Sequence, residues 1–212
     1  MSFRGTLDYK PVEAISFQSH AVFFYENRTQ SLPSVSANST NMNVSSVERS
    51  GLFYEQHDDA PLIISDIDRF NINYSNDGLQ ITLGRQAINL SSTFYFSPND
   101  FFAPFAANTF YRIYKPGVDA FRLDKDVDQL GQFTVIYALG FQADSEEDGA
   151  WASSVESDQN SLLLRYSGVL GNFGWSLLGG TLQDNELLGF GLQGEVFSWL
   201  GLRAEGNVSQ KK

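Results

Sequence analysis

Apolar and polar residues alternate with a period of two along most of the chain. In residues 130–142, Phe133, Val135 and Tyr137 share one parity, while mostly small or polar residues occupy the other. Ile136 is the single large apolar residue at a polar position of this run. Because successive side chains of an extended strand point to opposite faces of a sheet, the alternation predicts strands with one apolar and one polar face.

The same pattern recurs in segments spread over the whole sequence. Many of these runs are about 9–12 residues long, which suits a tilted membrane strand and exceeds the ~5–6 residues usual in soluble sheets. We therefore expect about ten antiparallel strands. Beside 130–142, the segments are 3–9, 15–25, 69–74, 79–84, 162–166, 173–177, 188–196 and 202–208.

Short turns and long polar links alternate between these segments, and the pair Asp77-Gly78 is a hairpin signal in one of the turns. Outer-membrane barrels have short turns on the periplasmic side and long loops outside. The sequence therefore predicts an all-β fold, an antiparallel transmembrane β-barrel that forms one domain over residues 1–212. A soluble β-sandwich or lipid-binding β protein is the alternative. The turns are expected at 10–13, 75–78, 125–129, 169–172 and 198–201, and the links at 26–50, 91–117, 143–160 and 183–186.

The phase of the alternation bears on the total number of strands. Bacterial barrels usually begin and end on the periplasmic side, with an even number of strands. Here the first segment leads directly into a short turn, and the last one runs outward. We therefore expect the chain to be part of a larger barrel. One additional strand near residues 51–56, where the alternation is poor, is the alternative.

Composition narrows the class of protein. No stretch approaches the ~18 consecutive apolar residues that a spanning helix needs. The net charge of -11 argues against nucleic acid as a partner, because nucleic-acid binders need a basic patch. Without cysteine, a disulfide framework and a thiolate metal site are both excluded. No apolar signal-peptide core follows Met1, so a cytosolic chain, a mature form and an excised piece all remain open.

Three sequence motifs follow one another in the middle of the chain. A strand end LGRQ at 83–86 precedes FSPNDFFAPF at 96–105 and YRIYKPGVDAFR at 111–122. This succession resembles porin-like outer-membrane barrels of Proteobacteria, in which a Gly-Arg-Gln strand end precedes an Asn-Pro-x-Asp-x-Phe-x-Pro-Phe-like loop and a Lys-Pro-Gly-x-Asp segment. Where that family often has Trp-Gly after Gly-Arg-Gln, this chain has AINL at 87–90. The resemblance implies a barrel and passive passage of small solutes, but no particular solute.

The link over residues 91–117 is rich in aromatic residues. A loop of about 25 residues in a compact domain is usually functional or disordered. Its aromatic side chains favour folding onto the lumen or mouth of the barrel, so we expect a constriction loop that narrows the pore. An aromatic plug or rim that packs against neighbouring loops is the alternative. The aromatic candidates are Phe96, Phe101, Phe102 and Phe105.

Charged residues in the strand segments and beside the aromatic link are candidates for lining the pore. Several arginines near one constriction favour anionic solutes, because charges around a pore set ion preference through the local field. The alternative for each arginine is a pair with a carboxylate that only braces the interior, since a buried charge needs a partner. The candidates are Arg69, Arg85, Arg112, Lys115, Asp119, Arg122, Arg165 and Arg203.

Enzymatic chemistry has little support in the sequence. His20 and His57 are the only histidines, and their surroundings lack a zinc-protease spacing. Ser16 and His20 share a polar face, as a barrel hydrolase would need, but such a pair arises readily by chance. We therefore expect no enzyme and no cofactor.

Two acidic groups invite a metal interpretation. Asp124, Asp126 and Asp128 resemble the start of a calcium loop, but Gln129 stands where the sixth position requires glycine. A solvated turn is therefore expected, with no metal site. The acidic residues within 144–148 lie in a long link, where they could meet divalent ions that bridge lipopolysaccharide or remain solvated.

The expected function is a porin-like channel of the bacterial outer membrane, for passive diffusion of small hydrophilic and preferably anionic solutes. Its other partners would be membrane lipid and lipopolysaccharide, and the oligomeric state stays open. A non-conducting barrel with a structural or interaction role is the alternative function.

Overall fold

The computed structural model describes residues 2–26, 53–56, 62–93, 97–102, 115, 117–141 and 155–211. These residues form eleven strands and one 3-10 helix, and no described helix is long and apolar enough to cross a membrane. The elements are β1 (Ser2–Val12), β2 (Ile15–Glu26), β3 (Phe53–Gln56), β4 (Leu62–Asn76), β5 (Leu79–Gln86), β6 (Val118–Asp126), β7 (Gly131–Ala138), η1 (Ser157–Gln159), β8 (Ser161–Leu170), β9 (Phe173–Leu182), β10 (Asn185–Phe197) and β11 (Leu200–Lys211).

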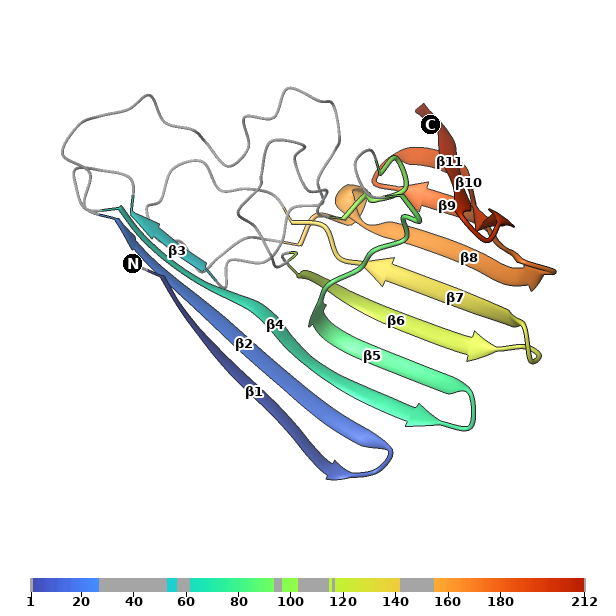
Figure 1. The fold of residues 1–212 in the computed structure, drawn as a ribbon. Helices are drawn as coiled ribbons and strands as arrows, with labels where there is room; N and C mark the ends of the chain where they lie inside the picture. Colours follow the sequence, from blue (N-terminus) through green and yellow to red (C-terminus); the bar gives the residue numbers. More distant parts are fainter. Residues whose placement is uncertain are drawn as a thin grey trace.

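All eleven strands belong to one curved antiparallel sheet (Figure 1). Ten of them follow one another in chain order from β1 to β11, and the short β3 pairs with β4 outside this path. The predicted all-β antiparallel architecture is therefore confirmed. The sheet path ends at β1 on one side and at β11 on the other, so the described strands do not close into a barrel.

The strand near residues 51–56 exists as β3, over Phe53–Gln56. Its four residues pair with Asp66, Ser65, Ile64 and Ile63 of β4. Two aromatic residues followed by two polar ones do not alternate, so the sequence pattern is weak here and the pairing with β4 comes from the tertiary structure.

Short turns occur at both ends of the sheet, and the link predicted at 183–186 is a two-residue turn between β9 and β10. The turns between β1 and β2, β4 and β5, β6 and β7, β8 and β9, and β10 and β11 lie at one end. In the predicted Asp77-Gly78 hairpin, φ is 45° at Asp77 and 68° at Gly78. Positive φ at both central residues is the geometry of a type I′ turn, whose twist matches that of the strands it joins.

One face of the sheet is apolar and exposed. A row of directly paired residues crosses seven strands on this face, and large apolar side chains elsewhere on it are also exposed, for example Phe3 at 65% and Leu188 at 72%. Residues at alternate positions of neighbouring strands thus meet on a single surface, as the sequence pattern predicts. The row runs Tyr9, Phe17, Ile72, Leu83, Phe121, Tyr137, Leu162.

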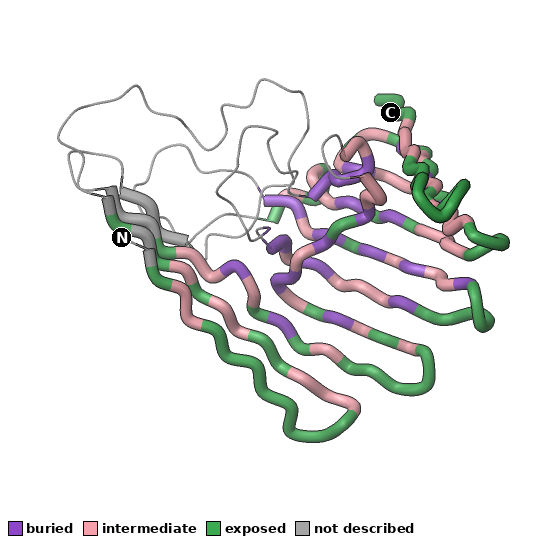
Figure 2. The backbone as a smooth tube through the Cα atoms, in the orientation of Figure 1, coloured by how far each residue is buried: buried purple, intermediate pink, exposed green. Residues whose placement is uncertain are grey.

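The opposite face carries the polar positions and is partly covered by residues 87–93 and 97–102, which are called the crossing segment below. Buried residues concentrate in the middle strands of the sheet, whereas β1 is largely exposed (Figure 2). Ile136, the apolar exception of its strand, is fully buried on this covered face together with Leu163. The exception is thus explained: a small core forms between the polar face and the chain that crosses it.

Candidate solute site on the polar face of the sheet

A carboxylate of β11 holds residues 91–93 and Asn99 on the polar face. Glu205 of β11 accepts hydrogen bonds from the Ser91 and Ser92 hydroxyls at 2.8 and 3.0 Å. It also accepts hydrogen bonds from the backbone N–H groups of Ser92, Thr93 and Asn99 at 2.6, 3.2 and 3.3 Å. Hydrogen bonds to a charged acceptor are the stronger kind, so Glu205 is the main polar anchor of this segment.

Two asparagines add further ties between the crossing segment and the last two strands. Asn99 Nδ2 donates to the Phe190 carbonyl at 2.9 Å, and Asn207 Nδ2 donates to the Pro98 carbonyl at 2.7 Å. A Cβ at Gly189 would lie 3.1 Å from Asn99 Oδ1, which is tighter than ordinary contact. The small residue in β10 therefore lets the segment approach the sheet.

Apolar side chains complete the attachment of this segment. Phe101 and Phe102 are 5% and 2% exposed, and they join Ile88 and Leu90 in one buried cluster. The cluster also contains residues that project from the polar face of the sheet: Ile136, Leu163, Leu178 and Leu187. Two of the predicted constriction aromatics, Phe101 and Phe102, are therefore buried between the crossing segment and the sheet. Phe96, Phe105 and Arg112 lie outside the described residues.

A buried ion pair joins Asp100 of the crossing segment to Lys115. Lys115 Nζ donates to Asp100 Oδ1, and the Lys115 carbonyl accepts a hydrogen bond from Arg69 Nη2 at 2.7 Å. Burial raises the pKa of Asp100 and lowers the pKa of Lys115, because both charged forms lose water. The Arg69 and Lys115 side chains thus both bind groups of the protein.

Arg85 and Asp119 form a second buried pair. The Arg85 Nε and Nη2 atoms donate to the two carboxylate oxygens of Asp119 at 3.1 and 2.8 Å. Its Nη1 donates to the Ile67 carbonyl at 3.0 Å, so the guanidinium bridges β4 and β6 at the end of β5. Arg85 is 1% exposed and does not line open space. It corresponds to the bracing alternative considered for each arginine.

Arg122 and Arg165 lie together on the polar face. Arg122 Nε and Nη2 donate to Asp124 at 2.7 and 3.0 Å, and the Thr134 hydroxyl donates to the same carboxylate at 2.7 Å. Thr134 is the direct cross-strand partner of Arg165. The register of β6, β7 and β8 therefore places two arginines and one carboxylate in one group.

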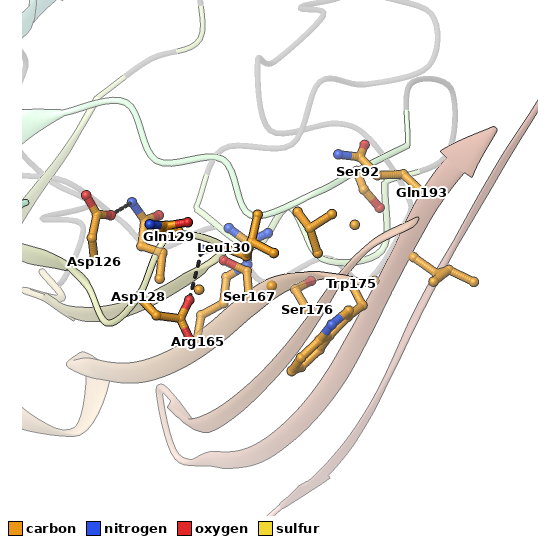
Figure 3. Close-up of a pocket in the computed structure, with 17 residues that line it drawn as sticks. Ser92, Asp126, Asp128, Gln129, Leu130, Arg165, Ser167, Trp175, Ser176 and Gln193 are labelled. Carbon is orange, nitrogen blue, oxygen red and sulfur yellow. Dashed lines mark hydrogen bonds between the residues drawn. The ribbon is translucent and has the colours of Figure 1, made fainter. Parts of the chain in front are cut away.

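A pocket of 530 Å³ opens beside Arg165 (Figure 3). Its lining comes from the β6–β7 turn, strands β7 to β10, and Ser92 of the crossing segment. A smaller pocket of 240 Å³ borders Arg69 and Arg122 among amide and hydroxyl side chains. Arg203 lines neither pocket. It is exposed, and its Nη1 donates to the Ser92 carbonyl at 3.1 Å.

Sequence reasoning did not identify the anchoring residues Asn99, Glu205 and Asn207 as part of a site. Glu205 and Asn207 occupy polar positions of their strand, and that was the only signal available. Their partners are about a hundred residues away in the sequence, as with Ser91 and Glu205 at a separation of 114.

His20, the histidine within the described residues, lies beside a carboxylate of the neighbouring strand. His20 Nε2 lies 3.3 Å from Asp8 Oδ1, and no hydrogen bond joins it to Ser16. Within the described ranges, no group of three or more potential metal ligands occurs. His57 and the acidic residues at 144–148 lie outside these ranges. The polar face of the sheet carries cations and hydrogen-bonding side chains, and such groups suit the binding or passage of a polar solute.

Comparison with family models, with curated proteins and with solved structures finds no match for this chain.

Proposed function

We propose that the chain forms the wall of an outer-membrane β-barrel through which small hydrophilic solutes, anionic ones preferentially, diffuse passively. The observation that carries this proposal is the opposite character of the two sheet faces. Large apolar side chains are exposed across consecutive strands on one face, while the other bears arginines, carboxylates and amides. A soluble monomer rarely exposes a contiguous apolar surface of more than a few hundred Å². A bilayer provides the matching solvent.

Closure of the sheet is part of the proposal. Unpaired backbone groups at a strand edge are costly in hydrocarbon, because no water is present to bind them. The edges at β1 and β11 must therefore be paired within a membrane, either with each other or with further strands. β1 and β11 stand at the two ends of a ten-strand antiparallel path, so they run in opposite directions and direct pairing would also be antiparallel.

The described residues 91–93 and 97–102 support a narrowed passage. They lie on the polar face that would become the lumen, and Glu205 holds them there. Arg122, Arg165 and Arg203 lie on the same face. Their positive charge would favour anions beside this segment, even though the net charge of the whole chain is -11.

A non-conducting barrel is the second candidate function. The buried cluster around Phe101 and Phe102 fills part of the polar face and would suit a plug. Conductance distinguishes the two functions, because a plugged barrel would pass no ions.

The experiment has two steps. Detergent-solubilised protein is compared on a gel with and without boiling, since a folded barrel migrates differently until it is heated. The protein is then reconstituted in a planar bilayer with a salt gradient. We expect a heat-dependent mobility shift, discrete conductance steps, and a reversal potential that reports anion preference. A protein that stays dissolved without detergent and shows no shift would contradict the membrane proposal. A shift without conductance would select the plugged barrel.

A substitution on the apolar face tests the same orientation. We expect Leu164→Asp, on the exposed face of β8, to destabilise the membrane-inserted form by about 2 kcal/mol, because a charge there would face hydrocarbon. Ser167→Asp, on the polar face of the same strand, is the matched control and should change stability little. Urea titration in lipid vesicles measures both variants. Equal effects of the two substitutions would mean that the faces are wrongly assigned.

A further inference from the structure

The pocket beside Arg165 has a composition that points to a particular kind of solute. It is lined by side chains of consecutive strands, with Gln132 on β7, Arg165 and Ser167 on β8, and Ser176 and Gln193 on β9 and β10 (Figure 3). Ser92 of the crossing segment borders it as well. A volume of 530 Å³ falls in the range of small-molecule sites.

Arg165 is the one cationic side chain among the residues that line this pocket. Its Nε atom is buried and has no hydrogen-bond partner in the part of the chain that the structure describes. Asp124 is the nearby carboxylate, but it already accepts two hydrogen bonds from Arg122 and one from Thr134. The positive charge of Arg122 repels the positive charge of Arg165. A buried donor without an acceptor is unfavourable, so the site favours an anionic group brought by a ligand.

The remaining lining can form hydrogen bonds to an uncharged polar solute body. Ser167, Ser176 and Gln193 make no side-chain hydrogen bond in the described part of the chain, so their donors and acceptors are available. A Cβ at Gly191 would lie 2.8 Å from Ser176 Oγ and 3.4 Å from Ser92 Oγ. The absence of a side chain at Gly191 therefore leaves room for both hydroxyl groups beside it.

Two carboxylates at the β6–β7 turn limit the charge of the ligand. Asp126 and Asp128 also line the pocket, and each accepts one hydrogen bond from its own turn region, from Gln132 Nε2 and from the Leu130 N–H group. Their negative charge acts against every anion, and about twice as strongly against a dianion as against a monoanion. A monoanion with several hydroxyl groups, its charge held at Arg165, fits this combination better than a dianion.

We infer that this pocket binds a small hydroxylated monocarboxylate, such as a sugar acid, with the Arg165 guanidinium on the carboxylate and the serine and glutamine side chains on the hydroxyl groups. This inference rests on the proposed function, since it names the solute class of the same polar face. It places a solute-binding step at the short-turn end of strands β7 to β10.

Equilibrium dialysis of radiolabelled D-glucuronate against the detergent-folded chain tests the inference without requiring conductance. We expect saturable binding that Arg165→Gln weakens about tenfold or more, because a charge-assisted bidentate contact is lost. Lys125→Gln removes the same charge from an exposed residue outside the pocket and should leave binding unchanged. Arg165→Lys keeps the charge without the planar fork, so an intermediate loss is expected.

Competing solutes test the same inference on the unaltered chain, so it stays testable even where a variant misfolds. Glucose lacks the carboxylate and glucose 6-phosphate carries more charge, so both should displace glucuronate poorly. Displacement by either as strong as by glucuronate would overturn the assignment to monocarboxylates. Equal glucuronate binding by the unaltered chain and a folded Arg165→Gln variant, or no binding at all, would also overturn it. Conductance without glucuronate binding would leave the proposed channel intact while removing this site.

Discussion

Replacing Arg85 with methionine is expected to destabilise the folded chain by about 3–5 kcal/mol, since it removes one partner of a buried ion pair. The Arg85 side chain has no solvent exposure, and Asp119 would lose both of its guanidinium contacts. The Ile67 carbonyl would lose its donor as well. Urea titration of the protein in lipid vesicles, followed by tryptophan fluorescence, gives the free energy of unfolding.

The double variant Arg85→Met with Asp119→Leu separates the cost of an unpaired charge from a general packing defect. Apolar replacement of both members of a buried pair is often close to neutral, so the double variant should recover most of the lost stability. Lys125→Met, at an exposed lysine of β6, is the matched control and should change stability little. A single variant as stable as the unaltered chain would contradict a bracing role for Arg85.

Glu205→Ala is expected to release residues 91–93 and Asn99 from the sheet. The substitution leaves the N–H groups of Ser92, Thr93 and Asn99 without their acceptor, together with the hydroxyl groups that donate to the same carboxylate. Hydrogen bonds to a charged group contribute about 1.5–3 kcal/mol each, so a total loss of about 3 kcal/mol or more is expected. In a conducting barrel, the single-channel conductance should rise several-fold as the passage widens.

Bilayer recordings and limited proteolysis of residues 91–102 measure the two consequences of this substitution. Glu195→Ala removes an exposed acidic residue of β10 and serves as the control for charge. Glu205→Gln keeps the shape of the side chain and should give an intermediate result. Unchanged conductance with increased proteolysis would mean that the segment is anchored by Glu205 but does not narrow the passage.

Much of the architecture is predictable from local sequence. The period of two identifies which residues share a face, and pairing across seven strands brings the odd-numbered aromatic and aliphatic residues of β1 and β2 onto one surface with Ile72 and Leu83. The Asp77-Gly78 turn is also predictable, because positive φ at two consecutive positions needs residues of this kind.

The candidate site is predictable only in part. Polar parity places Arg122 and Arg165 on the polar face of the sheet, but the same parity does not show that Asp124 accepts hydrogen bonds from Arg122 and Thr134. Lys115 forms a buried ion pair with Asp100 and does not face open space. Both outcomes depend on where side chains end in three dimensions, and alternation along a single strand carries no such information.

By itself, the sequence determined the β-class of the fold, the two faces of its strands and the positions of its short turns. Those features depend on the backbone geometry of a few neighbouring residues. Only the tertiary structure decided that Glu205 anchors residues 91–93 and Asn99, that Arg85 pairs with Asp119 and that Arg165 borders an open pocket. These features depend on strand register and on contacts between residues far apart in the chain, which side-chain packing sets for the sheet as a whole.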